Sequence, residues 1–109
     1  MKRIYTYGHQ HVERNITIAD IIANKNNRVK MTQVTAQNRE EAEILSDQKI
    51  DMIITGSDTY EDVRQGAPNT FITAALFAGR FITKNDILKG AIDVAMKGAD
   101  SVLTPRSPE

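Results

Sequence analysis

Short apolar runs alternate with helix-forming patterns along this sequence, and this alternation limits the fold more than any other feature. The helical patterns begin at clear caps, which are the capping boxes Thr17–Asp20 and Thr83–Asp86 and the N-cap Asn38. Because the connections are short, the strands between the helices are expected to be parallel and joined by right-handed crossovers. The sequence therefore predicts an α/β fold of parallel β/α units with about four strands. The expected strands are Val29–Val34, Met52–Thr55, Asn69–Leu76 and Ser101–Thr104.

Four β/α units make up half of an eight-stranded (β/α)8 barrel. We expect residues 17–109 to form a partial β/α barrel-like domain, resembling the first half of such a barrel, or a small open sheet. Residues 1–16 are expected to be an N-terminal segment, with a short strand at Ile4–Tyr7. In an extended segment His9 and His11 share one face, which allows a metal site. Since no carboxylate or cysteine pair lies nearby, we favour an exposed terminal segment.

Charge and composition exclude several classes of protein. The 14 basic and 14 acidic residues cancel, and no basic stripe favours nucleic acid. Cysteine is absent, which removes thiolate chemistry and disulfides and is compatible with a reducing compartment. No apolar run approaches the length of a membrane span, and the N-terminus lacks the apolar region of a signal peptide. We expect a cytoplasmic protein without nucleic-acid or membrane partners.

The stretch Ile50–Pro68 is the strongest candidate for a functional site. Its apolar run stops at Gly56 and is followed by Ser57, Asp58 and Thr59, so a buried strand delivers polar groups to its carboxyl end. An alternative is purely local, because Ser and Asp are also favoured helix N-caps and a short helical pattern follows. The sequence alone leaves both interpretations open.

Four stretches of the chain carry a family resemblance. They are TIADIIANKNNRVKMTQVTAQN, KIDMIITGSD, VRQGAPNTFITAALF and AMKGADSVLT. In order and spacing they resemble the N-terminal part of the ketopantoate hydroxymethyltransferase (3-methyl-2-oxobutanoate hydroxymethyltransferase) family, a group of barrels in the phosphoenolpyruvate mutase and isocitrate lyase superfamily. The resemblance continues to Glu109, apart from a shorter loop between Asp58 and Val63.

The resemblance implies a metal-dependent transferase of the pantothenate pathway. Members of the family that the chain resembles bind a small α-keto acid through a divalent metal, usually magnesium. They use methylenetetrahydrofolate as the co-substrate and form homo-oligomers. At the family's G-D-S motif this chain reads Gly56-Ser57-Asp58, so the carboxylate is displaced by one residue. The family's other metal-binding or substrate-binding positions carry different residues here. They are Gln37, Asn38, Ala75, Leu103 and Pro105.

These substitutions shape the expected function. We predict a truncated or divergent relative of the hydroxymethyltransferases, with the family activity weak or lost in this chain. The candidate metal ligand is Asp58, and the candidate substrate-binding residues are Ser57, Asp58, Thr59 and Arg80. Two alternatives stay open: a non-catalytic half-barrel that self-assembles or complements a partner chain, and a different enzyme that binds a small carboxylate.

Overall fold

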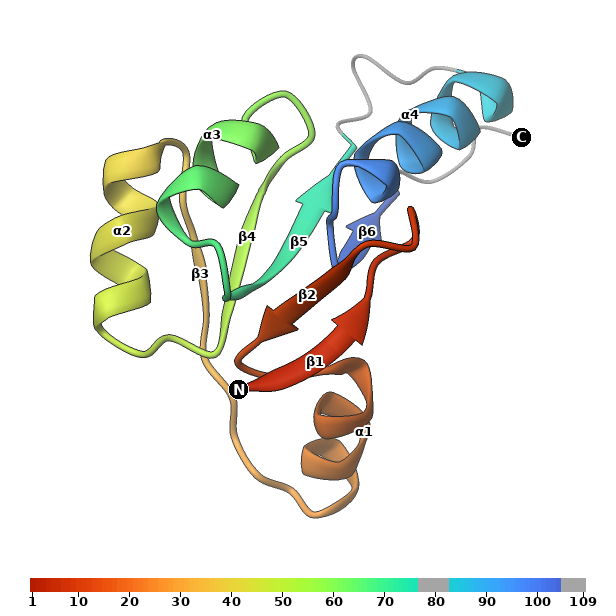
Figure 1. Ribbon diagram of the computed structural model, residues 1–109. Helices are drawn as coiled ribbons and strands as arrows, with labels where there is room; N and C mark the ends of the chain where they lie inside the picture. The colour runs from red at the N-terminus through yellow and green to blue at the C-terminus, as the bar shows by residue number, and fades with distance from the viewer. Residues whose placement is uncertain (77–82, 105–109) are drawn as a thin grey trace.

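The central feature of the computed structural model, which describes residues 1–76 and 83–104, is a sheet of four parallel strands in the order β3-β4-β5-β6. Helices alternate with these strands, and this arrangement confirms the predicted α/β fold of parallel β/α units (Figure 1). The strands are β3 (Gln33–Thr35), β4 (Met52–Gly56), β5 (Phe71–Ala75) and β6 (Ser101–Leu103), and the intervening helices are α2 (Arg39–Asp47), α3 (Tyr60–Gly66) and α4 (Lys84–Met96).

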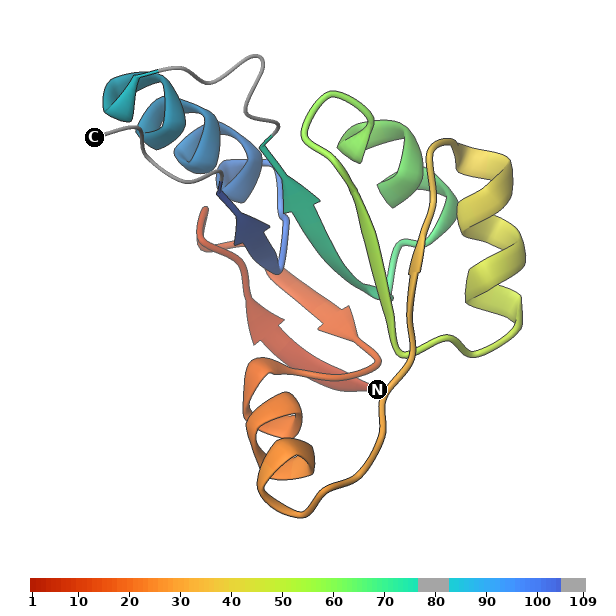
Figure 2. The ribbon, with the colours of Figure 1, turned by 180° about the vertical axis from the view of Figure 1, so that it is seen from behind.

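The hydrophobic core lies between one face of the sheet and these three helices. Ile53 of β4 and Ile72 of β5 are paired in register and fully buried, and Val63 of α3 and Val94 of α4 pack in the same cluster. From both sides, α2 and α3 lie beside β3 and β4, and α4 lies beside β5 and β6 (Figures 1 and 2). All five residues of β5 are buried, as expected for an inner strand of a parallel sheet.

The predicted helix caps form as the sequence indicates. Thr17 begins α1 (Ile18–Asn26) and Thr83 begins α4, each with a complete capping box. The Asn38 side chain accepts a hydrogen bond from the Glu41 N–H at the start of α2. Helix α4 is followed by Gly98 with φ of +110°, a left-handed conformation that glycine adopts without strain.

The first strand of the sheet begins later than predicted. It starts at Gln33 rather than Val29, because the Asp51 carboxylate takes both the N–H and the hydroxyl of Thr32. The Thr32 carbonyl still accepts from the Met52 N–H. A side chain thus replaces the backbone partner that a longer strand would need.

The apolar side chains of the helices are only partly buried. In α2, Ala42 is buried and Leu45 packs against the core, whereas Ile44 is exposed. Helix α1 has no buried residue, and both Ile18 and Ile22 are 56% exposed. These isoleucines therefore lie outside the core.

The N-terminal residues form an antiparallel hairpin of β1 (Lys2–Tyr5) and β2 (His11–Arg14). The sequence predicted only one short strand here. The turn is closed by hydrogen bonds from Thr6 N–H to the Gln10 carbonyl and from His9 N–H to the Thr6 carbonyl, with His9 at φ of 64°.

A buried ion network joins this hairpin to the amino ends of the sheet strands. Arg14 Nε lies 2.8 and 2.9 Å from the two carboxylate oxygens of Asp100, and both side chains are only 3% exposed. Arg64 Nη2 of α3 donates to the same carboxylate at 2.9 Å, and the Ile72 N–H donates at 3.0 Å. A single carboxylate therefore connects β2, α3, β5 and the approach to β6.

Asn15 adds a second connection between the hairpin and the sheet. Its N–H donates to the Asn69 carbonyl, its side-chain oxygen accepts from the Phe71 N–H, and its side-chain nitrogen donates to the Asp51 carbonyl. The hairpin is consequently bonded to the strand starts. In barrel-like folds that end of the sheet contributes to stability, and the opposite end carries function.

Candidate functional site

A hollow of about 460 Å³ opens at the carboxyl ends of the four parallel strands. Each strand contributes to it, either from its last residues or from the residues that follow. Since carboxyl ends of parallel strands are where ligands bind in α/β folds, this hollow is the candidate site. Its lining residues are Thr35, Ala36, Gln37, Ile54, Thr55, Gly56, Asp58, Thr59, Ala75 and Leu103.

The turn after β4 determines which polar groups face the hollow. The Ser57 N–H donates to the Ala75 carbonyl at 3.0 Å, which extends the pairing of β4 with β5 by one residue. The chain then turns back, with the Thr59 N–H donating to the Gly56 carbonyl at 3.2 Å. The hydroxyls of Thr55 and Thr59 lie 2.6 Å apart. As a result Asp58 lines the hollow, and Ser57 does not.

The candidate residues from the sequence therefore separate into distinct groups. Asp58 and Thr59 come together in the hollow, whereas Ser57 lies beside it. Arg80 lies outside the described residues. The N-cap of α3 is Thr59 rather than Ser57 or Asp58, and the Thr59 side chain makes no capping hydrogen bond. The geometry thus gives Asp58 a position in the hollow besides its place before the helix.

Three positions singled out by the family resemblance also line the hollow: Gln37, Ala75 and Leu103. Asn38 instead caps α2, and Pro105 lies outside the described residues. The lining is therefore mixed. Its apolar walls come from Ala36, Ile54, Ala75 and Leu103, and its hydroxyl, amide and carboxylate oxygens come from Thr35, Gln37, Thr55, Asp58 and Thr59.

The described lining residues of the hollow could hold magnesium only together with oxygens of a bound ligand. Asp58 is the one carboxylate among the described lining residues, and no group of three potential metal-ligating side chains occurs within residues 1–76 and 83–104. Magnesium keeps several waters and is held by one or two carboxylates together with oxygens of the ligand. Asp58 alone does not make up a magnesium site, and a chelating ligand would have to supply the remaining oxygens.

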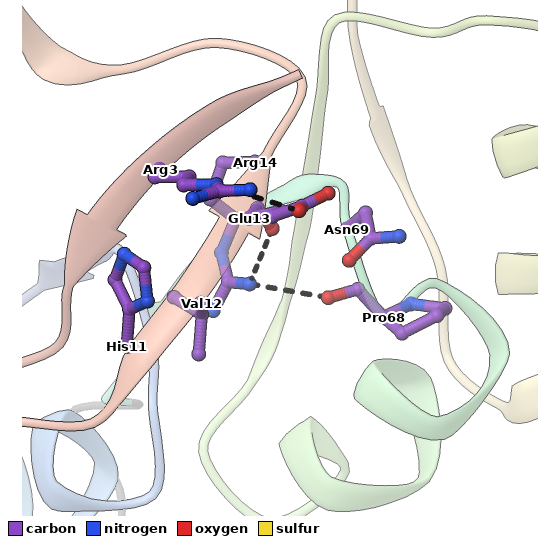
Figure 3. A pocket seen from close by; sticks show the side chains of 7 residues that line it. All are labelled: Arg3, His11, Val12, Glu13, Arg14, Pro68 and Asn69. Atoms are coloured by element: carbon purple, nitrogen blue, oxygen red, sulfur yellow. Dashed lines mark hydrogen bonds and ion pairs between the residues drawn. The ribbon is translucent and has the colours of Figure 1, made fainter.

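A second hollow of about 450 Å³ lies against the N-terminal hairpin, between β2 and the Pro68–Asn69 segment (Figure 3). Its charges are already engaged. Arg3 Nε lies 3.9 Å from a Glu13 carboxylate oxygen, and Arg14 Nη1 donates to the carbonyls of Glu13 and Pro68. This hollow belongs to the attachment of the hairpin.

The histidines of the hairpin are not part of a metal cluster within the described chain. The His11 ring packs against the Tyr5 ring, with centroids 5.1 Å apart. His9 occupies the turn. The structure thus places His9 in the hairpin turn and His11 on β2.

Fold and hollow together define a class, an α/β protein with a mixed polar and apolar pocket at the carboxyl ends of parallel strands. Neither a protein-family model nor a curated protein matches this chain. Among the described helices none is long and apolar enough to cross a membrane.

Proposed function

We propose that this chain is a divergent relative of the ketopantoate hydroxymethyltransferases that binds a small α-keto acid in the strand-end hollow. The observation that carries the proposal is the position of Asp58. Although its carboxylate is displaced by one residue in the sequence, the turn after Gly56 brings Asp58 into the lining of the hollow. The setting we propose is the cytoplasm.

We expect this binding to depend on a cation. Asp58 is the charged group among the described lining residues, and a divalent cation would attract both its carboxylate and the carboxylate of a keto acid. Magnesium would supply a positive charge between the Asp58 carboxylate and the ligand's carboxylate and keto oxygens. Ile54 and Leu103 offer apolar surface for a short aliphatic side chain.

The hydroxymethyl transfer is expected to be weak or absent in this chain. The position of the family's second acid is Ala75, which cannot bind a cation, and Leu103 stands where the family has its substrate-binding lysine. At these two positions the chain therefore offers no group that would stabilise a transition state with developing negative charge. Transfer of the hydroxymethyl group from methylenetetrahydrofolate is therefore expected to be slow or absent even when the keto acid binds.

Titration calorimetry with ketoisovalerate, with and without magnesium, tests this proposal. Binding is expected only when magnesium is present, and Asp58→Ala is expected to abolish it. Ser57→Ala is the matched control, because Ser57 belongs to the same turn but does not line the hollow. Failure of the wild-type chain to bind at millimolar ligand contradicts the proposal. Binding that is unaffected by magnesium and by Asp58→Ala favours a different, metal-free carboxylate binder.

A second candidate function is assembly of two copies into a closed barrel. Within residues 1–76 and 83–104, neither β3 nor β6 has a partner strand on its outer side. Parallel sheets are normally covered on both faces, yet Leu103 is 55% exposed where it lines the open face. If a two-fold axis along the strand direction relates the two copies, β6 of each copy can pair in parallel with β3 of the other. A helix that covered the open face would leave both edge strands unpaired.

The edge of β3 provides the test of this candidate. Because Thr32 O and Ala36 N bond to β4, alternation points the Thr35 N–H away from the sheet. Light scattering is expected to give about twice the 12.2 kDa of one chain. Thr35→Pro removes the outward N–H and is expected to give monomers, and Thr35→Val is the control that keeps it. A monomer in the wild type contradicts this candidate.

A further inference from the structure

The strand-end hollow reaches both open edges of the parallel sheet. Its lining includes Thr35 of β3 and Leu103 of β6, which are the two outer strands of the sheet. Both residues are exposed, Leu103 by 55%. In the part of the chain that the structure describes, neither edge has a further strand beside it. A strand that pairs with either edge therefore also borders the hollow.

The helix beside β6 leaves an apolar flank uncovered. Lys97, the C-cap of α4, lies 2.8 Å from a Glu61 carboxylate oxygen of α3 and so marks the side of α4 that faces α3. Leu88 precedes Lys97 by nine residues, which places it about 180° away around the helix. Leu88 and Ile92 are 59% and 42% exposed. The apolar flank of α4 therefore faces away from α3, toward the side of the open β6 edge (Figure 1).

The helix beside β3 repeats this pattern at the other end of the sheet. Ala42 of α2 is buried, and a Cβ at Gly66 of α3 would lie 2.9 Å from the Ala42 Cβ, so this side of α2 faces α3. Ile44 is two residues further on, about 200° away around the helix, and it is 58% exposed. Both ends of the β/α layer thus combine an unpaired strand with an uncovered aliphatic side chain on the neighbouring helix.

The charges beside these two flanks have opposite signs. In helical projection two lysines, Lys84 and Lys89, border the apolar flank of α4, and two glutamates, Glu40 and Glu41, border that of α2. All four side chains are exposed. Joining the β6 end of one copy to the β3 end of another brings opposite charges to the same junction, whereas joining two like ends brings like charges together.

The exposed surface area is also large enough for a second copy. The chain exposes 7339 Å², whereas a compact monomer of its 12.2 kDa is expected to expose about 6,100 Å². The difference of about 1,200 Å² exceeds the roughly 800 Å² that each partner buries in a standard stable interface. A single added strand covers one edge, but a second copy covers both.

We propose that the ligand site is shared between two copies, with the hollow of each copy completed by the partner's Thr35 and Gln37. The inference rests on the proposed function for its ligand and on the paired edges for its geometry. Parallel pairing of β6 with the partner's β3 brings all carboxyl ends to one mouth. The partner's strand end then lies beyond Leu103 and closes the open side of the hollow to water. Keto-acid binding and self-association are therefore coupled.

Gln33 offers a variant that disturbs assembly but not the hollow. It lies on β3, it is not among the lining residues, and alternation points its N–H away from β4, as for Thr35. Gln33→Pro removes that N–H and is expected to leave the single chain folded, because edge strands accept proline. Gln33→Thr keeps the N–H and is the matched control. Thermal melting checks the fold of both variants.

A second pair of variants tests the junction from the helix side. Leu88→Glu puts an acid on the flank that meets the partner's Glu40 and Glu41 and is expected to give monomers. Leu88→Lys removes the same apolar side chain but matches the partner's charge, and is expected to weaken assembly less. These variants keep the inference testable if Gln33→Pro does not fold.

The measurement is titration with ketoisovalerate in magnesium-containing buffer, with light scattering on the same samples. The wild type and Gln33→Thr are expected to be dimers of equal affinity, and Gln33→Pro is expected to be monomeric and to bind about 5–150-fold more weakly. A monomeric variant that binds as tightly as the wild type, a folded Gln33→Pro that stays dimeric, or a wild type that is monomeric when saturated with ligand overturns the shared site and leaves the proposed function standing. Absence of binding by a dimeric wild type at millimolar ketoisovalerate refutes the proposed function and the shared site together.

Discussion

Replacing Asp100 by asparagine removes the negative charge at the centre of the ion network and changes little else in shape. The asparagine side chain still offers an oxygen to the Ile72 N–H, but Arg14 and Arg64 lose their counter-charge. Arg14 is 3% exposed and Arg64 is 15% exposed, so water compensates them poorly. Breaking a buried ion pair by removal of one partner costs about 3–5 kcal/mol. This is a large part of the roughly 5–15 kcal/mol that stabilises a typical domain.

Urea denaturation followed by circular dichroism measures the loss. With a slope of about 2 kcal/mol per molar urea, the midpoint is expected to fall by about 2 M. The control is Glu43→Gln, which breaks the exposed Arg39–Glu43 pair and is expected to cost about 0–1 kcal/mol. A loss for Asp100→Asn as small as that of the control refutes the claim that this carboxylate holds the hairpin to the sheet.

Two further predictions concern packing and pH. A Cβ at Gly66 would lie 2.2 Å from the Arg39 carbonyl oxygen, so Gly66→Ala is expected to cost about 1–3 kcal/mol or more, whereas Gly8→Ala meets its neighbours at 3.5 Å and is expected to be nearly neutral by thermal melting. Burial raises the pKa of Tyr60 above its ordinary 10.0. The unfolded chain therefore loses this proton first, and stability is expected to be intact below about pH 10 and to fall as pH rises through the folded pKa. Tyr60→Phe is expected to flatten that fall in urea midpoints, and an unchanged slope contradicts the assignment.

The parts of the fold that depend on local signals were predictable from the sequence. The capping boxes at Thr17 and Thr83 fix the starts of α1 and α4, and Gly98 marks the end of α4. These features involve contacts between residues a few positions apart. The buried strand β5 was also predictable, because its apolar run is continuous.

The parts that depend on distant contacts were not predictable. Nothing near Arg14 in the sequence indicates that it pairs with Asp100, 86 residues away. The hairpin was missed because its two short runs flank Gly8 without a strong turn signal, although the Arg3–Glu13 and Ile4–Val12 pairs show a regular register once aligned. The Arg14–Asp100 pair requires the fold to bring β2 beside the approach to β6.

The candidate site stands between these cases. Asp58 and Thr59 were candidates from the strand end, whereas Gln37, Ala75 and Leu103 were noted only as positions where the family's residues are replaced. Thr35 was missed as a lining residue, because the first strand was predicted to end one residue earlier than it does. Side chains alternate along an extended segment, so the one-residue displacement of Asp58 would turn it away from the hollow if the chain did not turn back after Gly56.

Amide chemical shifts recorded during titration with magnesium and ketoisovalerate test the central claim most directly, because they locate the ligand on the chain. The account predicts saturable shifts at the amides of Gln37, Gly56, Asp58 and Thr59 when both components are present, and their loss in Asp58→Ala. Shifts that instead cluster on the N-terminal hairpin, or no shifts at millimolar ligand, contradict the claim that the strand-end hollow is the binding site.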